Sequence, residues 1–290
     1  MDRLIDLHTH STCSDGSMTP RELVAHAKAS GMAAIALSDH DSVDGVHEAV
    51  AEGERLGVEV VPAIELSAQS ATETHILGYF IDPDSPAMAL AMKKIREVRE
   101  ERSRENCRKL CELGFPVTME EVREIAGGEI VCRAHFARLL LNKGLVGSVK
   151  EAFDKYLANG RPAYSGLQAL TDEEAIDLIH KAGGIAFLAH LHLIRLSDED
   201  LFAFLKRLKA AGLDGIEGYY TEYTQEMQEK FRGMARALSL EISGGTDFHA
   251  AMKPHIAIGR GTGGLEIPYS VLERLKIYYK NKIIKTKRKV

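Results

Sequence analysis

Two histidines close to the N-terminus have the type and spacing of metal ligands. His8 and His10 lie two residues apart in the segment IDLHTHSTCSDG, whose first residues read as a short strand. Alternate residues of a strand point to the same face, so both imidazoles can reach one point. Asp15 follows in a Ser-Asp-Gly turn and could add a carboxylate to a site for a divalent cation. For this segment taken alone, an ordinary polar strand end is the alternative.

Residues of the same types recur where the other apolar runs end. In chain order they are Asp39, His40, Asp41, Glu65, His75, His190, His192, Asp247 and His249. The carboxyl ends of the strands in a parallel barrel open onto one face, where enzymes of this architecture assemble their sites. Burying so many polar groups together without a cation would cost several kcal/mol each. The pattern therefore predicts a metal centre at one end of a barrel.

The elements that would position these residues alternate between strands and helices, as expected for βα units. The expected strands are the segment around Ile5–Leu7, MAAIALSDHD, VEVVPAIELS, THILGYFI, GIAFLAH, GIEGYY and LEISGGTDFH. Amphipathic helices are expected at about 20–30, 45–56, 172–182, 198–211 and 223–238. Seven strands can close into a parallel barrel, somewhat smaller than the eight-stranded form. The predicted fold class is therefore α/β, a distorted seven-stranded (β/α)7 barrel with an inserted all-helical subdomain.

Helical segments alone fill residues 86–165. The first, MALAMKKIREVREERSRENCRKLCELG, is long and charged, and shorter helices ended by glycine or turn residues follow it. A coiled-coil arm is the alternative for the long helix, although no heptad pattern persists through it. We expect a barrel made of 1–85 and 166–275, a helical insertion at 86–165 that covers one end of it, and a basic C-terminal tail at 276–290.

Composition indicates an acidic globular protein. The net charge of the chain is −5, but the last fifteen residues carry seven Lys or Arg and no acid, so the rest carries −12. An acidic body suits cation binding and does not indicate a broad nucleic-acid surface. We see no signal peptide and no membrane span, expect the four cysteines to be reduced thiols, and predict a cytoplasmic protein without an obligate protein partner.

Five segments of the chain resemble, in order, the motifs of a known family. DLHTHSTCSDG, SDHD, AIELS, HILGY and GTDFH are similar to the successive motifs of the polymerase and histidinol phosphatase (PHP) family of metal-dependent phosphoesterases. The helical insertion, with CRAHFAR and YLANGRPAY, resembles the branch that acts on nucleoside 3′,5′-bisphosphates and short RNA ends. The resemblance spans residues 4 to about 260.

This resemblance implies a ligand set for two to three divalent ions. His8, His10, Glu65 and Asp247 would hold the first; Glu65, His75 and His190 the second; and Asp15, His40 and His249 the third. Mixed imidazole and carboxylate ligands suit Mn²⁺, our first choice, or Zn²⁺ or Fe²⁺. Leu191 stands where the family commonly has proline, so His190 and His192 could exchange roles, although the alanine before His190 favours it as the ligand.

The expected chemistry is attack on phosphorus by a hydroxide held between two cations, with Glu65 and Asp247 serving the reaction as ligands. His192 is our candidate for protonating the leaving alkoxide, with a metal-bound water as the alternative. Arg133 and Arg195 could hold a phosphate that is not cut, and His135 could contact a nucleotide; each could also be an ordinary residue of the helix or loop surface.

Three functions remain in competition. The first is hydrolysis of small nucleotides, such as adenosine 3′,5′-bisphosphate to AMP and phosphate, or of short 5′-phosphorylated RNA. The second is an L-histidinol-phosphate phosphatase or another small-molecule or cyclic phosphoesterase. The third is a non-enzymatic module that binds nucleic acid through the basic tail.

Overall fold

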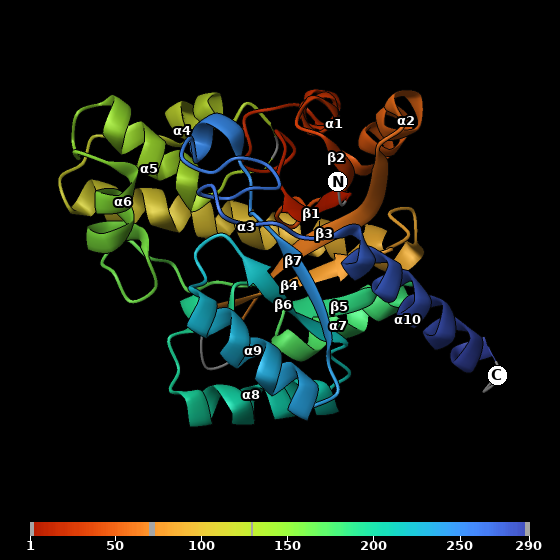
Figure 1. The fold of residues 1–290 in the computed structure, drawn as a ribbon. Coiled ribbons are helices and arrows are strands. Elements are labelled where there is room, and N and C mark those ends of the chain that lie inside the picture. The colour runs from red at the N-terminus through yellow and green to blue at the C-terminus, as the bar shows by residue number, and fades with distance from the viewer. Residues whose placement is uncertain (1–2, 70–72, 129, 288–290) are drawn as a thin grey trace.

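The computed structural model describes residues 3–69, 73–128 and 130–287. Seven strands form one sheet in sequence order, and this sheet curls into a nearly closed barrel (Figure 1). The strands are β1 Leu4–Thr9, β2 Met32–Leu37, β3 Glu59–Gln69, β4 Glu73–Tyr79, β5 Ile185–Leu188, β6 Gly215–Tyr220 and β7 Glu241–Gly245. The predicted fold class is therefore confirmed.

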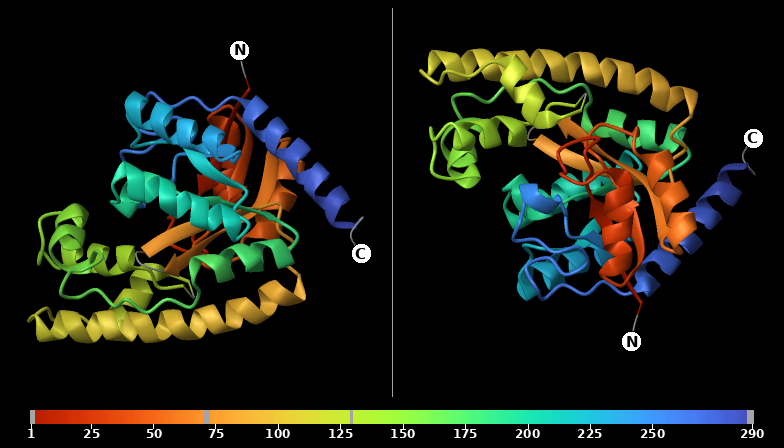
Figure 2. Two further views of the ribbon diagram at one scale, coloured as in Figure 1. Left: turned by 90° about the horizontal axis from the view of Figure 1, so that it is seen from below. Right: turned by 90° about the horizontal axis from the view of Figure 1, so that it is seen from above.

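Helices cover the outside of this barrel (Figure 2). The α-helices of the described residues are α1 Pro20–Ala29, α2 Val46–Leu56, α3 Pro86–Glu112, α4 Met119–Ala126, α5 Arg133–Asn142, α6 Val149–Ala152, α7 Asp172–Lys181, α8 Asp198–Ala210, α9 Gln225–Ala237 and α10 Tyr269–Lys287, of which α4, α5 and α6 belong to the insertion. At the start of α1, Thr19 caps the helix, Pro20 takes the first position and Glu22 completes a capping box, as their order in the sequence predicts.

The expectation of an all-parallel barrel is wrong for one strand. β4 runs antiparallel to both of its neighbours, β3 and β5. The reason is the short connection between β3 and β4, because parallel strands need a crossover of a dozen or more residues. The start of β4 consequently lies beside the carboxyl end of β3, with His75 opposite Ser67. His75 reaches the expected face because its strand is reversed.

The first and last strands meet just beyond the end of β7. The Phe248 amide donates to the His8 carbonyl at 3.2 Å, and the His10 amide donates to the Phe248 carbonyl at 2.9 Å. A Cβ atom on Gly245 would lie 2.2 Å from the Cβ of His8, so the two backbones can approach only because this residue is glycine. The contact places the end of β7 against the first pair of histidines.

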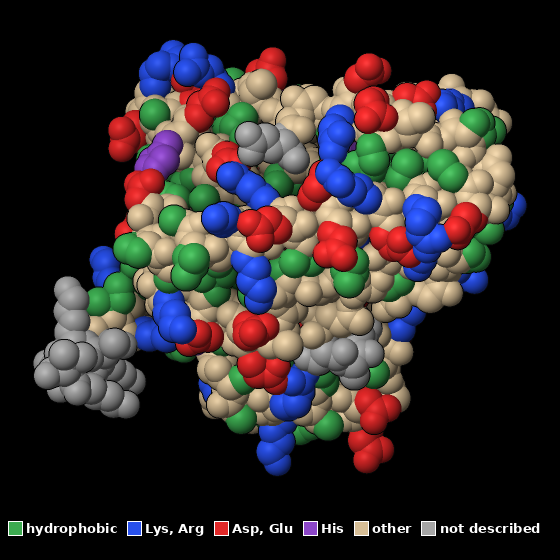
Figure 3. All heavy atoms as spheres, turned by 180° about the vertical axis from the view of Figure 1, so that it is seen from behind, with side chains coloured by type: hydrophobic (Ala, Val, Ile, Leu, Met, Phe, Trp, Pro, Cys, Tyr) green, Lys and Arg blue, Asp and Glu red, His purple; other side chains and the backbone are tan. Residues whose placement is uncertain are grey.

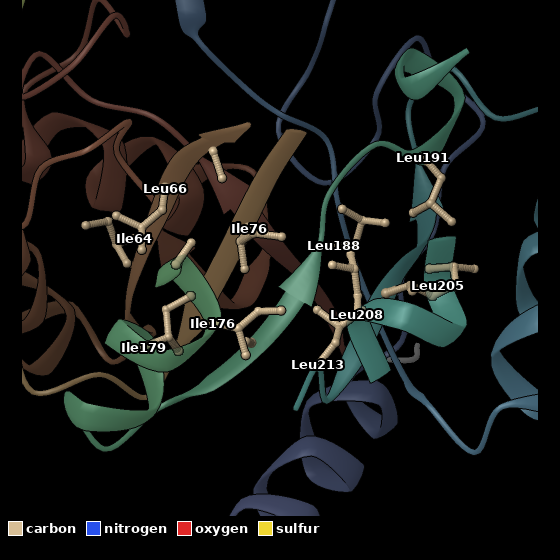
Figure 4. Packing of buried hydrophobic residues seen from close by; sticks show 14 of the residues in the cluster. Ile64, Leu66, Ile76, Ile176, Ile179, Leu188, Leu191, Leu205, Leu208 and Leu213 are labelled. Carbon is tan, nitrogen blue, oxygen red and sulfur yellow. The ribbon is translucent and has the colours of Figure 1, made fainter. Parts of the chain in front are cut away.

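The largest hydrophobic cluster joins the sheet to the helices packed on it (Figure 4). Ile64 and Ile76, from β3 and β4, meet Ile176 and Ile179 of α7, and all four side chains are fully buried. Every buried CH₂ group contributes about 0.8 kcal/mol. This packing fixes the strands whose ends carry the site.

The helical insertion has a hydrophobic core of its own. Fourteen buried residues between Cys107 and Ala163 form a separate cluster, with Phe136 and Leu140 of α5 among its fully buried members. α3 lies along one side of the barrel and carries α4, α5 and α6 beyond it (Figure 2). Met88, Met92 and Ile95 of α3 pack instead into the barrel cluster, so the long helix is anchored in both cores.

The basic C-terminal stretch continues α10, which begins before it at Tyr269. Lys276 pairs with Glu59 at 2.5 Å and Lys282 with Asp214 at 2.6 Å, both at the end of the barrel where the strands begin. Figure 3 shows Lys and Arg interspersed with Asp and Glu over the described part of one face of the molecule. Among the described residues, no helix has both the length and the apolar character that crossing a membrane requires.

Candidate metal centre and active site

The two histidines of the first strand lie at the centre of a buried polar cluster. His8 lies near the end of β1 and His10 directly follows that strand, and neither is exposed. The Nε2 atom of His10 lies 3.3 Å from Glu65 Oε2 and 3.2 Å from Asp247 Oδ1. β1, β3 and the segment after β7 therefore place three of the predicted ligands within reach of one ion.

Glu65 faces the nitrogen atoms of five histidines. Its Oε2 lies 3.2 Å from His8 Nε2, 3.3 Å from His10 Nε2 and 3.0 Å from His40 Nδ1, and its Oε1 lies 2.9 Å from His75 Nδ1 and 3.0 Å from His190 Nε2. The carboxylate is fully buried near the middle of β3. Both of its oxygens are thus directed at candidate ligands, as a carboxylate shared between two ions requires.

Asp15 lies close to a second group of histidine nitrogens, which includes the other ring nitrogen of His10. His249 Nε2 lies 3.0 Å from Asp15 Oδ1, and His40 Nε2 and His10 Nδ1 each lie 3.9 Å from it. His40 therefore has one nitrogen toward Asp15 and the other toward Glu65. This bridging position differs from the predicted assignment of His40 to the third ion alone.

Unsatisfied polar atoms indicate that the site fits metal ions. Buried side-chain atoms without a hydrogen-bond partner among the described residues include His8 Nε2, His10 Nδ1, His10 Nε2, Asp15 Oδ1, His40 Nδ1 and Glu65 Oε2. Three groups of these residues have ligand atoms close enough together to hold an ion: His10, Asp15, His40 and His249; His8, His10 and Glu65; and His40, Glu65 and His75. Orphaned imidazole nitrogens and carboxylate oxygens are the donor set of borderline divalent ions.

The electrostatics of the cluster favour bound cations. Burial raises the pKa of Glu65, but His40, His8 and His75 outweigh burial and hold that pKa well below its ordinary value. Burial likewise acts to lower the pKa of His8, while Glu65 and Glu217 raise it well above the ordinary value. The site is therefore built to keep its carboxylates ionised beside positive charge.

Strained backbone directs several of these side chains. Asp41, His190 and Asp247 have positive φ angles of 52°, 26° and 58°. Non-glycine residues in this region cost about 1–3 kcal/mol each and cluster at functional sites. Each of the three follows the end of a strand.

Asp39 and Asp41, which follow β2, support the site from behind. Asp39 accepts hydrogen bonds from the hydroxyls of Ser11 and Ser14, at 2.6 and 2.5 Å, and so fixes the loop between His10 and Asp15. Asp41 accepts a hydrogen bond from the Ser67 amide at 2.8 Å and pairs with Arg99 of α3. The carboxylates of both aspartates are thus engaged by hydrogen bonds or an ion pair within the protein.

A cavity of about 260 Å³ opens in front of the cluster. Asp15, His40, His75, His190, Asp247 and His249 lie on its barrel side, and Arg99, Arg102, Arg133, Val149 and Phe153 reach it from the insertion. The insertion therefore covers the end of the barrel that carries the ligands. Phe153 begins a π-helical turn, Phe153–Leu157, a feature that often occurs at functional sites.

Of the predicted substrate contacts, only Arg133 lines this cavity. Its Nη2 atom pairs with Glu73 Oε1 at 2.6 Å. His135 is buried with its Nδ1 accepting from the Cys132 amide at 3.0 Å, so it caps α5. Arg195 is exposed and does not line the cavity.

His192, the predicted general acid, lies beside the site and outside the cavity wall. Its Nε2 atom is 2.8 Å from Glu222 Oε2, and its ring packs against the rings of Tyr220 and Tyr223. His190 provides the nitrogen that faces Glu65, which supports the choice of His190 over His192 as the ligand.

Sequence reasoning missed three cations that line the cavity. Lys253 pairs with Asp247 Oδ2 at 2.6 Å. Arg99 and Arg102 lie one turn apart on α3, a spacing that would have placed both on one face of the helix. The guanidinium of Arg102 donates to Gln168 Oε1 at 2.7 Å, and no carboxylate of the described chain lies within ion-pair distance of it. Burial and the neighbouring Arg99 lower the pKa of Arg102 to about 10.

The family follows from a comparison with known proteins. The model of the PHP domain matches residues 6–243, from within β1 to within β7. The chain belongs to the PHP family. This PHP protein is 37% identical to a 3′,5′-nucleoside bisphosphate phosphatase of Chromobacterium violaceum, over 85% of its own length and 87% of that protein. It is 34% identical to a 5′-3′ exoribonuclease of Haemophilus influenzae, over 86% and 91% of the two chains.

Its fold matches a solved structure closely. A candidate metal-dependent phosphoesterase from Bifidobacterium adolescentis is 26% identical, with a TM-score of 0.83 over 94% of this chain and 95% of that one. This PHP protein is thus a metal-dependent phosphoesterase, which confirms the predicted family and hydrolase class and excludes the non-enzymatic module.

Proposed function

We propose that the protein hydrolyses small nucleotides that carry two phosphate groups, with the nucleoside 3′,5′-bisphosphates as the preferred class. The observation that carries this proposal is Arg102, a buried guanidinium that lines the cavity opposite the ligand cluster and has no carboxylate partner in the described chain. Buried charges are normally paired, so this one calls for an anion from the substrate. One phosphate would meet the ligand cluster and the second would meet the arginines.

The nine predicted ligands would hold two to three divalent ions, Mn²⁺ being our first choice. Such ions neutralise phosphoryl oxygens and lower the pKa of water, which supplies the nucleophile. Side chains of the protein would add positive charge and a proton donor. Lys253, beside Asp247, adds positive charge at the cavity wall. His192 remains our proposed proton donor and would have to turn from Glu222 toward the cavity to act.

The metal requirement gives the first expected result. Protein purified without chelators should contain about two to three equivalents of transition metal, and dialysis against EDTA should abolish phosphoesterase activity until Mn²⁺ is restored. Elemental analysis beside an activity assay checks this. A metal-free preparation that still turns over substrate would contradict it.

The cavity also has an apolar side suited to a nucleobase. Val149, Phe153, Leu193 and Met252 line it, and Leu193 is 49% exposed at its mouth. Stacking of a base on an aromatic side chain is worth about 1–3 kcal/mol. A base held there would leave both phosphates free to reach the charged walls.

Removal of the aromatic ring tests this surface. Phe153→Ala should raise KM for a nucleoside bisphosphate about 5- to 150-fold, from the stacking energy lost, and should change KM for a base-free substrate such as ribose 5-phosphate little. Steady-state kinetics on both substrates measures the difference. An equal rise for both would mean that Phe153 supports the fold of the insertion instead.

The direct test of the proposed function compares three substrates on one purified sample: adenosine 3′,5′-bisphosphate, L-histidinol phosphate and a short 5′-phosphorylated RNA. The proposal expects the highest kcat/KM on the bisphosphate. Preference for the RNA would favour the exonuclease activity, which the same two-anion cavity also supports, since adjacent phosphates of RNA carry two charges. Preference for histidinol phosphate, which has one phosphate, would overturn the proposal.

A further inference from the structure

Glu217 is a buried carboxylate that belongs to neither the predicted ligands nor the cavity wall. It is the third residue of β6 and is completely inaccessible to solvent. Its Oε1 atom lies 2.9 Å from His8 Nδ1, and its Oε2 atom accepts a hydrogen bond from the His190 amide at 2.7 Å. The two oxygens thus contact two candidate ligands, one in β1 and one just after β5.

The contact with His8 determines which nitrogen of that ring faces the cluster. A carboxylate oxygen accepts hydrogen bonds, so Nδ1 of His8 carries a proton and Nε2 is the nitrogen left for an ion. The Nε2 atom is buried without a hydrogen-bond partner and lies 3.2 Å from Glu65 Oε2. The tautomer that Glu217 selects is therefore the one that can bind an ion.

The contact with His190 holds a strained backbone. His190 has a φ of 26° and a ψ of 61° directly after β5, and its ring reaches Glu65 Oε1 at 3.0 Å. The hydrogen bond from its amide to Glu217 fixes this conformation from inside the barrel. One side chain thereby orients two ligands, one for each oxygen of Glu65.

No lysine or arginine of the described chain forms an ion pair with Glu217. Its hydrogen-bond donors are the His8 imidazole and the His190 amide. A cation bound at Nε2 of His8 would be coupled to this carboxylate through the ring, as in the carboxylate–histidine–metal arrangement of other metal sites.

We propose that Glu217 is a positioning residue of the metal centre, which sets the tautomer of His8 and the backbone of His190 so that both present nitrogen to the ions. This inference depends on the metal centre alone and is independent of which phosphate ester is the substrate.

The test is metal affinity of the Glu217→Gln variant. Glutamine offers one acceptor and one NH₂ donor to two N–H groups, so one of the two contacts becomes a clash of donors. Competition titration of the metal-free protein with Mn²⁺ against a fluorescent chelator should show affinity about 10- to 100-fold weaker for the tightest site, the usual cost of losing such a partner.

Asp214→Asn is the matched control. Asp214 directly precedes the same strand, is 3% exposed, and accepts hydrogen bonds from the Ala186 amide and Tyr278 at the opposite end of the barrel. It should lower the thermal midpoint without changing Mn²⁺ affinity. If Glu217→Gln binds Mn²⁺ as the wild type does, or Asp214→Asn weakens binding equally, the proposal is overturned.

A second measurement needs no Glu217 variant. In Zn²⁺-loaded wild-type protein labelled with ¹⁵N-histidine, the His8 resonances, assigned by their loss in His8→Gln, should show the proton on Nδ1 and the metal on Nε2. The opposite arrangement would overturn the proposal even if Glu217→Gln did not fold.

Discussion

Glu65→Gln is expected to lower kcat at least about 100-fold and to reduce the metal content of the purified protein. The carboxylate faces five histidine nitrogens with two ionised oxygens, and the amide would replace one of those oxygens with a hydrogen-bond donor. Loss of a few kcal/mol of charge stabilisation corresponds to a factor of this size. Steady-state kinetics and elemental analysis measure the two effects.

Asp15→Asn is the comparison for this variant. Asp15 meets three of the histidine nitrogens with a single oxygen, so its loss should cost less activity and less metal than the loss of Glu65. Circular dichroism checks that both variants are folded. Wild-type metal content in Glu65→Gln, with activity retained, would remove Glu65 from the centre of the site.

Arg102→Met should separate the two phosphates of the substrate. A hydrogen bond between charged groups is worth about 1.5–3 kcal/mol, so kcat/KM for adenosine 3′,5′-bisphosphate should fall roughly 10- to 150-fold. p-Nitrophenyl phosphate has one phosphate and gives Arg102 nothing to bind, so the ratio of the two kcat/KM values should fall by nearly the same factor.

Arg104→Met is the control for charge on the same helix. The side chain of Arg104 is 69% exposed and pairs with Glu100 on the surface of α3. Its substitution should leave kcat/KM unchanged for both substrates. Arg133→Ala is a less clean variant, because it removes the ion-pair partner of the partly buried Glu73. Equal losses on both substrates in Arg102→Met would indicate damage to the insertion or to the metals.

The barrel and the clustering of the candidate ligands could be predicted because the signal is local. Each strand ends in a short motif, such as HTH or SDHD, and the strand ends of a barrel meet by geometry alone. The reversal of β4 was not predicted, although the few residues between AIELS and HILGY leave no room for a helix. All nine predicted ligands lie in one cluster.

The supporting residues could not be predicted, because their partners lie far away in the sequence. Glu217 contacts His8 across 209 positions, and in GIEGYY it is one acid in an otherwise unremarkable strand. In the sequence, Arg102 lies in a charged helical segment that predicts an exposed surface, whereas in the fold this residue is buried. The capping role of His135 could not be predicted either, since it depends on where α5 begins.

Because β4 is reversed, the length of α3 determines where the arginines on this helix lie relative to the site. β4 ends at the end of the barrel opposite the candidate ligands, so the chain must return to the end that carries them. α3 spans this distance as one continuous helix (Figure 2). From Pro86 to Arg99 a helix rises about 20 Å, close to the length of a seven-residue strand. Each residue inserted or deleted in that stretch would rotate Arg99 and Arg102 by about 100° around the helix axis. We therefore expect related proteins to lack insertions and deletions in α3 before Arg102 and to tolerate them beyond Glu112, where they no longer change the positions of the two arginines.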